Sequence, residues 1–454
     1  MDKFGKFGVI WAGQLVSVIG SALSAFVIGV WVYLGTGSVT QFVLIQFCAA
    51  VPGILVSPIA GVITDRFDRK RIMLTADLAA GVATAILLAL VASDALTVWP
   101  IYLTTALSSA ANSFHLIAYS ALVPSLVPKK HLGRVNGLMQ ITQGVQIAAP
   151  LVAGALLGLV GLHGVLMIDL ASMAVAVTTL AVTKLPAEAI RPTPSDKAPA
   201  GFTAGLRYLG TRRGLLDLVI VFCAFNFLFA IAGGLVQPLI LSFSSPATLG
   251  VLMAAGGSGL FVGSLVMAAW GGPKRRVDGV YLGLVLGGLF LVLHSVHPSP
   301  WLIAVAAPCF LFTLPLMNTM CMTLIQTKVD PDVLGRVLGA VRMLATAATP
   351  IAFLLIGPLS DGVFEPLMAE DGALAGSVGA VIGTGDGRGI ALIFLVVGVL
   401  MLAVAAYAYT RPRLRNIDTE IPDAVADDPA PSEQPIAIPI ETSADTVRKE
   451  PARD

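Results

Sequence analysis

Apolar runs of membrane-spanning length recur along almost the whole chain. A helix needs about 20 mainly apolar residues to cross the hydrocarbon core of a bilayer. Runs of this kind, separated by short polar or Gly- and Pro-containing turns, occupy residues 8–34, 42–64, 72–92, 98–122, 136–160, 164–184, 215–241, 248–270, 279–297, 300–325, 337–360 and 389–410. The pattern predicts an all-α membrane protein with twelve transmembrane helices.

Lys and Arg residues fall almost entirely in alternate loops of this arrangement. If the N-terminus is cytoplasmic, Arg388 is the only one of the 28 Lys and Arg residues that lies in an outer loop. Loops that remain in the cytoplasm carry most of the Lys and Arg residues near membrane helices. We therefore expect both termini to be cytoplasmic.

A short internal repeat divides the spans into two sets of six. The segment Leu132–Gly137, with sequence LGRVNG, recurs as Leu334–Gly339, with sequence LGRVLG. The copies open the fifth and eleventh spans, so Arg134 and Arg336 take equivalent places in two halves. Parallel repeats of six spans are typical of transporters, whose substrate path lies between the halves. We predict two pseudo-symmetric six-helix bundles, at residues 1–184 and 215–410.

The remaining segments are a linker and a tail. Residues 185–214 contain several prolines and are expected to form a cytoplasmic linker, ending in an amphipathic stretch at 202–213 that could lie on the membrane surface. Beyond Asn416 the chain is acidic and proline-rich, with few bulky apolar residues. Such a composition cannot form a core, so residues 411–454 are expected to be a disordered cytoplasmic tail.

Composition excludes a soluble protein and gives no sign of an enzyme. The chain is 56% hydrophobic and 12% charged, with a mean hydropathy of +0.87, whereas soluble domains are about 25% charged. Its cysteines lie inside apolar spans at unrelated spacings: Cys48, Cys223, Cys309 and Cys321. We find no nucleophile elbow, phosphate-binding loop or metal-ligand pattern, and expect no enzymatic activity, cofactor or metal.

The loop between the second and third spans carries the most specific motif. A glycine precedes an acid by four residues, and a dense basic cluster follows: Gly61, Asp65, Arg66, Arg69, Lys70 and Arg71. This arrangement resembles the G-x-x-x-D-R-x-x-R-[KR] signature of the major facilitator superfamily. The resemblance covers residues 1–410 and implies the major facilitator fold. It also implies that this loop latches the two halves in one state of a transport cycle; the alternative is that its basic residues only set topology.

Within that superfamily the chain resembles bacterial drug and siderophore exporters, including those for macrolides and enterobactin. The features that carry this resemblance are Gln14, Ser17, Asp77, the two LGRV segments, Ile168-Asp169 and Asn226. One motif departs from the family pattern. Proton-coupled drug antiporters often have Gly-Pro-x-x-Gly-Gly in the fifth span, whereas residues 149–154 retain only Pro150 and Gly154, with alanine at the other two positions. Close helix packing is still expected there, but the inference of antiport is weakened.

Two residues are candidates for proton coupling. Asp77 lies between one and two turns into the third span, where a carboxylate must be paired, protonated or hydrated. It is either an interfacial acid paired with a nearby base or a coupling group. His115 could carry a proton near neutral pH or act as a neutral hydrogen-bond donor. Asp169 and Asp217 are expected near span ends, and neither is favoured for coupling.

A larger set of polar residues occupies apolar spans and could line a substrate cavity. Amides at three-residue steps lie close to one face of the fifth span. For each residue an interhelical hydrogen bond is as good an interpretation as substrate contact. The set consists of Gln14, Ser17, Asn112, Gln140, Gln143, Gln146, Asn226 and Asn318.

These patterns lead to three functional hypotheses. The first is a secondary active exporter in the bacterial cytoplasmic membrane that moves an amphipathic drug, siderophore or natural product outward, by proton antiport. The second is an uptake symporter on the same fold. The third is a membrane sensor or scaffold that transports nothing. We expect a small-molecule substrate, protons and the lipid bilayer as partners, no nucleic acid, and a monomer.

Overall fold

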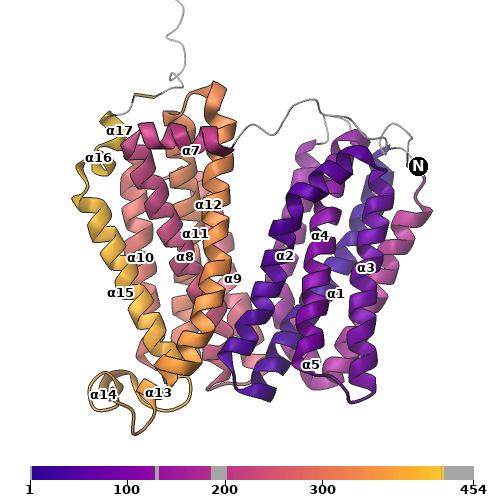
Figure 1. Ribbon diagram of the computed structural model, residues 1–454, viewed down its shortest axis with the longest axis horizontal. Coiled ribbons are helices and arrows are strands. Elements are labelled where there is room, and N and C mark those ends of the chain that lie inside the picture. The colour runs from indigo at the N-terminus through magenta and orange to yellow at the C-terminus, as the bar shows by residue number, and fades with distance from the viewer. Residues whose placement is uncertain (1–2, 128–131, 186–201, 421, 424–454) are drawn as a thin grey trace, which may run out of the picture.

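The computed structural model describes residues 3–127, 132–185, 202–420 and 422–423, and these form helices in two groups (Figure 1). The first group is α1 (Lys3–Thr36), α2 (Val39–Arg66), α3 (Arg69–Ala92), α4 (Val98–Leu126) and α5 (Leu132–Val182). The second group is α7 (Phe202–Thr211), α8 (Arg213–Leu241), α9 (Pro246–Trp270), α10 (Arg276–Val296), α11 (Pro300–Lys328), α12 (Pro331–Leu359), η2 (Ser360–Phe364), α13 (Glu365–Met368), α14 (Gly379–Ile382), α15 (Arg388–Thr410), α16 (Pro412–Arg415) and α17 (Ile417–Glu420).

The expected set of membrane spans is present. Within the described residues, ten helices are long and apolar enough to cross a membrane. One of them, in α5, contains two expected spans, because the chain turns at Gly161, where φ is 66°. The helix α4 is the remaining span; it is 29 residues long, and Ser, Asn and His residues interrupt its apolar sequence. The prediction of an all-α membrane fold is confirmed.

Exposed side chains form the surface that a bilayer requires. The side chains of Leu55, Leu103 and Leu159 are 69%, 70% and 80% exposed. The indole rings of Trp99 and Trp301, at the starts of α4 and α11, are also well exposed. Indoles favour the boundary between lipid and water, so these two mark one edge of the apolar belt.

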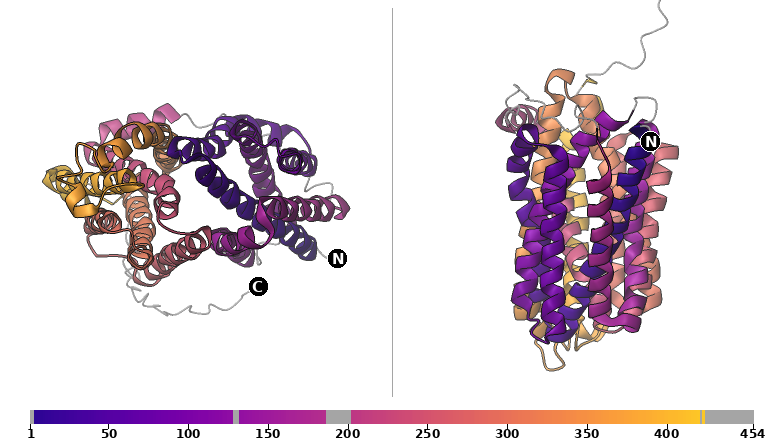
Figure 2. Two further views of the ribbon diagram at one scale, coloured as in Figure 1. Left: turned by 90° about the horizontal axis from the view of Figure 1, so that it is seen from below. Right: turned by 90° about the vertical axis from the view of Figure 1, so that its right-hand side faces the viewer.

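The two groups touch at one end of the molecule and separate toward the other (Figure 1). We call the end with the residue 66–71 cluster and both described chain ends the basic end, and the other the opposite end. Viewed along the helices, the groups lie side by side (Figure 2). They meet through α2 with α12 and through α5 with α9.

Glycines bring these helices into backbone contact. A Cβ added to Gly154 of α5 would lie 2.5 Å from the carbonyl oxygen of Pro246, and one added to Gly250 of α9 would lie 2.4 Å from that of Pro150. Each glycine therefore lets the other helix approach. Pro150 and Gly154 lie on this contact between the two groups.

The helix α7 packs against the second group of helices. The sequence had also allowed this amphipathic stretch to lie on the membrane surface. Leu209 is fully buried, and the backbone of Gly205 lies against the carbonyl of Arg336 in α12. The Tyr208 hydroxyl donates to Asp330 at 2.9 Å, and Arg212 pairs with the same carboxylate at 3.3 Å. Burial raises the pKa of Tyr208, so the phenol, which is neutral near pH 7 in any case, remains a donor at higher pH as well. The amphipathic face thus covers α12.

The start of the C-terminal tail is ordered, contrary to the expectation of disorder from residue 411. Leu414 of α16 and Ile417 of α17 are fully buried. Lys328 donates to the carbonyl of Asp418 at 2.7 Å and pairs with Asp423 at 2.9 Å. Two apolar side chains and a buried lysine hold this segment in place. So few residues do not change the acidic, proline-rich composition on which the expectation of disorder was based. Residues 421 and 424–454 lie outside the described residues.

Candidate functional site

A cavity of about 900 Å³ lies within the first group of helices and reaches α8. Polar side chains from α1, α3, α4 and α5 line it together with aromatic and apolar ones. Several predicted residues meet there: Gln14, Ser17, Asp77, Asn112, His115, Gln146 and Pro150. The second group contributes one lining residue, Gln237 of α8. The cavity is therefore built almost entirely by one bundle.

Asp77 forms the centre of a polar cluster nearer the basic end. Its Oδ1 atom lies 2.7 Å from Nδ1 of His115, and its Oδ2 atom accepts a 3.0 Å hydrogen bond from Gln14. The side chains of Asp77 and His115 are both 14% exposed. The His115 ring stacks on Tyr119, whose buried hydroxyl has no hydrogen-bond partner among the described residues. The base that the structure shows beside Asp77 is thus His115 of α4.

Asp169, which was expected near the end of the sixth span, forms a second cluster inside the first bundle. Its side chain is 3% exposed and lines the cavity. It accepts hydrogen bonds from the hydroxyls of Ser21 at 3.1 Å and Thr84 at 3.3 Å. Asp169 lies about two helical turns beyond the turn at Gly161.

Close packing of α1 on α5 produces this second cluster. A Cβ on Gly20 would lie 2.9 Å from the Cα atom of Asp169, and one on Gly13 would strike the Thr179 side chain. Only glycine lets the two backbones approach so closely. The adjacent Ser21 hydroxyl then reaches the Asp169 carboxylate.

The two clusters form successive levels of one polar track. Gln14 and Ser21 are seven residues apart on α1, as are Asp77 and Thr84 on α3, which is about two turns or 10 Å. Among the residues that the structure describes, the lining includes both carboxylates and one histidine, but no Lys or Arg. An uncompensated carboxylate inside a membrane is costly. The cavity therefore suits a proton or a cationic group.

The basic loop is divided between exposed residues and residues that hold the first bundle together. Asp65 and Arg66 are exposed, and a Cβ on Gly61 would meet nothing within 4 Å. Lys70 donates to the carbonyls of Ala181 and Thr183, both at 2.9 Å, at the end of α5. Cations favour helix C-termini, so Lys70 stabilises that end.

Two more basic residues of the loop contact nearby groups. Arg69 is buried and donates to the carbonyl of Ala121 in α4 at 3.1 Å. Arg71 lies 3.9 Å from Asp68, whose carboxylate caps the start of α3. These contacts stay inside the first bundle, so they account for the local structure of the loop. They give no structural reason for Gly61 and Asp65.

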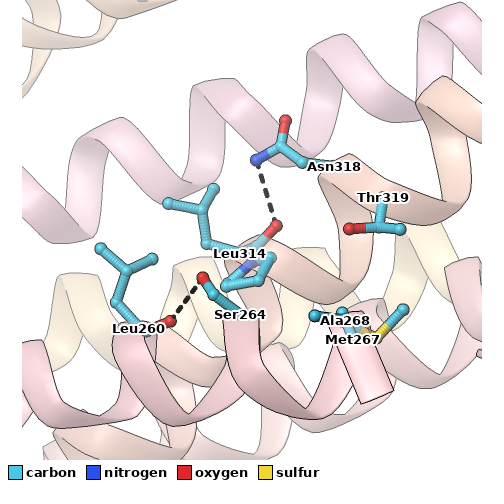
Figure 3. Close-up of a pocket in the computed structure, with 8 residues that line it drawn as sticks. Leu260, Ser264, Met267, Ala268, Leu314, Asn318 and Thr319 are labelled. Carbon is cyan, nitrogen blue, oxygen red and sulfur yellow. Dashed lines mark hydrogen bonds between the residues drawn. The ribbon is translucent and has the colours of Figure 1, made fainter. Parts of the chain in front are cut away.

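The remaining candidates lie elsewhere. Asn226 donates to the carbonyl of Phe222 on its own helix at 2.8 Å, and neither residue lines the cavity. Asn318 lines a separate pocket of about 450 Å³ between α9 and α11, where it donates to the carbonyl of Leu314 (Figure 3). Arg336 is exposed on α12. The side chains of Arg134, Gln140 and Gln143 lie outside what the structure describes.

Sequence reasoning missed Thr84 and Gln237 in the cavity. A usable signal for Thr84 was its position two turns after Asp77 on one helix face. Gln237 is a single amide in an apolar span, and only the packing of α8 against α1 brings it to the cavity.

Known proteins similar to this chain were found by sequence. A sequence model for the Major Facilitator Superfamily matches residues 10–353. The macrolide efflux protein A of Streptococcus pyogenes is 26% identical over 373 residues, which cover 80% of this chain and 92% of that protein. The multidrug efflux pump Tap of Mycobacterium tuberculosis is 27% identical over 371 residues, which cover 79% of this chain and 87% of the pump.

Solved structures share the fold at lower sequence identity. The nucleoside transporter NupG superposes with a TM-score of 0.68 and 13% identity, covering 92% of this chain and 100% of that chain. A bacterial homologue of the iron transporter ferroportin, in an inward-facing state, superposes with a TM-score of 0.64 and 15% identity, covering 90% of this chain and 100% of that chain.

Proposed function

Because the chain belongs to the Major Facilitator Superfamily, we propose that it exports amphipathic, drug-like molecules across a bacterial cytoplasmic membrane. Relatives named as macrolide and multidrug efflux proteins support the direction and the substrate class. Rocking of the bundles at residues 1–184 and 215–410 would expose the cavity to each side in turn. Residues 185–214 would link these moving units.

The cavity carries the proposal, because its lining matches an amphipathic substrate. Trp11, Phe26 and Phe42 supply apolar surface, while Asp77 and Asp169 supply negative charge. The unpartnered hydroxyl of Tyr119 adds a hydrogen-bonding group. A single chain forms this cavity, so transport by a monomer is part of the proposal.

Proton antiport would use the ion pair between Asp77 and His115. Protonation of Asp77 would remove its attraction for His115 and for a cationic substrate, whereas deprotonation would restore both. One proton taken up would therefore release the substrate. The basic end would face the cytoplasm, since it carries the 66–71 cluster.

Inverted membrane vesicles test this function. A macrolide or a fluorescent drug should accumulate when the vesicle interior is acidic, and accumulation should stop when an ionophore dissipates the pH gradient. Equal accumulation of the drug with and without the pH gradient would refute antiport. Accumulation in right-side-out vesicles alone would indicate uptake, and the absence of transport across a broad panel would leave only the non-transporting hypothesis.

A further inference from the structure

The spacing of the Gly61–Asp65 motif recurs at the opposite end of the molecule. Gly357 precedes Asp361 by four residues, as Gly61 precedes Asp65. Asp65 is the next-to-last residue of α2, and Asp361 lies just beyond the end of α12, in η2. The two helices run side by side in opposite directions, so the motifs lie at the two ends of one helix pair (Figure 1).

At the opposite end this motif is engaged. Asp361 accepts three hydrogen bonds at the start of α2: from the Ser38 hydroxyl at 2.7 Å, the Val39 amide at 3.0 Å and the Thr40 amide at 2.9 Å. A helix N-terminus has free N–H groups and a partial positive charge, so a carboxylate stabilises it. A residue of one bundle thus caps a helix of the other.

Gly357 makes the backbone contact that this cap needs. A Cβ at this position would lie 2.7 Å from the Cα atom of Thr40. At the basic end, a Cβ on Gly61 would meet nothing, and Asp65 is exposed. The Gly357–Asp361 motif is therefore in contact with the other bundle, whereas the Gly61–Asp65 motif is not in contact with it.

We propose that Gly357 and Asp361 are gating residues that hold the opposite end of the transporter closed, as the counterpart of Gly61 and Asp65. The glycine lets the partner helix approach, and the acid caps that helix. Closing one end of the α2–α12 pair separates the other, so the two motifs engage in turn. This inference rests on the alternating access proposed above, but its test does not depend on transport.

Distances between spin labels test the proposal on the full chain. The four native cysteines are replaced, and labels are placed at exposed positions, Phe67 and Thr211 for the basic end or Thr97 and Val381 for the opposite end. Asp361→Ala should shift the ratio of the two conformers by about tenfold, which is about 1.4 kcal/mol, toward a shorter basic-end and a longer opposite-end distance.

Two further variants make the result specific. Ser38→Ala, which removes one donor to Asp361 and leaves the acid in place, should shift both distances the same way but less. Asp65→Asn should leave the basic end open or open it further. Asp371→Ala is the matched control, since it removes an exposed acid from the same loop and should change neither distance.

The outcomes separate this inference from the proposed function. Unchanged distances in Asp361→Ala and Ser38→Ala, or shifts in the direction of Asp65→Asn, would overturn the gating role. Shifted distances in a protein that moves no substrate would uphold the latch and refute the transport function instead.

Discussion

At the scale of single residues, the environment of a carboxylate matters more than its place in the sequence. Asp77 was a candidate for proton coupling, whereas Asp169 was not favoured because the sequence placed it near a span end. Both line one cavity, where Asp77 faces His115 and Asp169 faces only hydroxyls. The sequence placed the turn before Asp169 correctly, near Gly161, but it gave no signal of the close packing of α1 that buries this carboxylate.

Asp77→Asn is predicted to uncouple transport from protons. The amide cannot be titrated, so accumulation driven by a pH gradient should fall to the level without a gradient. Exchange of labelled for unlabelled substrate needs no net proton movement, so it should continue, but with a lower affinity for a cationic substrate because the amide carries no charge. Asp94→Asn, the same change at an exposed acid beyond the end of α3, should retain both activities. Full gradient-driven accumulation by Asp77→Asn would contradict this assignment.

Gly20→Ala is predicted to destabilise the first bundle. The added Cβ would meet the Ser172 side chain and the Asp169 backbone, so α1 must move away from α5. Overpacking of this kind costs about 1–3 kcal/mol. Thermal unfolding in detergent should show a lower Tm than for Gly8→Ala, where a Cβ on the same helix meets nothing within 4 Å. Equal Tm values would show that the contact can relax.

At the scale of elements, short amphipathic segments pack where sequence composition indicated linkers or tails. The helices α7, α16 and α17 each bury one or two apolar side chains against the second bundle. Long apolar spans were predictable because their signal extends over many residues. A helix held by one leucine and one ion pair leaves no such signal, since its stability depends on the surface it meets.

Leu414→Ala is predicted to lower the stability of the second bundle. Leu414 is fully buried, whereas its neighbour Arg413 is exposed. Removing a buried leucine side chain costs about 2–5 kcal/mol, and a surface change stays within about 0.5 kcal/mol. Thermal unfolding of Leu414→Ala and Arg413→Ala should therefore differ, and limited proteolysis should cut the first variant sooner near residue 411. Matching profiles would mean that α16 contributes no stability.

At the scale of the whole molecule, the fold followed from the sequence but the conformation did not. Hydrophobic runs and the LGRV repeat predicted an all-α fold of twelve spans, because each span must satisfy its own backbone hydrogen bonds in lipid. The contacts that hold the bundles together join residues far apart in the sequence, such as Ser38 and Asp361, which are 323 positions apart. A local sequence pattern cannot predict such a contact. The same sequence also fits a conformation in which the basic end is closed and the opposite end is open.

The orientation in the membrane is predicted to put the basic end in the cytoplasm. In a cysteine-free background, Phe67→Cys should react with a membrane-impermeant maleimide only after cells are opened. Val381→Cys, which lies at the opposite end and is 75% exposed, should react in intact cells. The reverse pattern would invert the topology, and with it the proposed direction of transport.

The two ends of the α2–α12 pair are unequal, and this has a consequence for turnover. The start of α2 offers a hydroxyl and two amides and has no acid in its first turn. The start of α12 has Pro331, which lacks an N–H group, and the acids Asp330 and Asp332. Asp65 would therefore find a poorer site than Asp361 does, so we expect the empty carrier to rest with its cavity toward the cytoplasm. At low drug concentration the arrival of substrate, and not the return of the empty carrier, would then limit the rate of export.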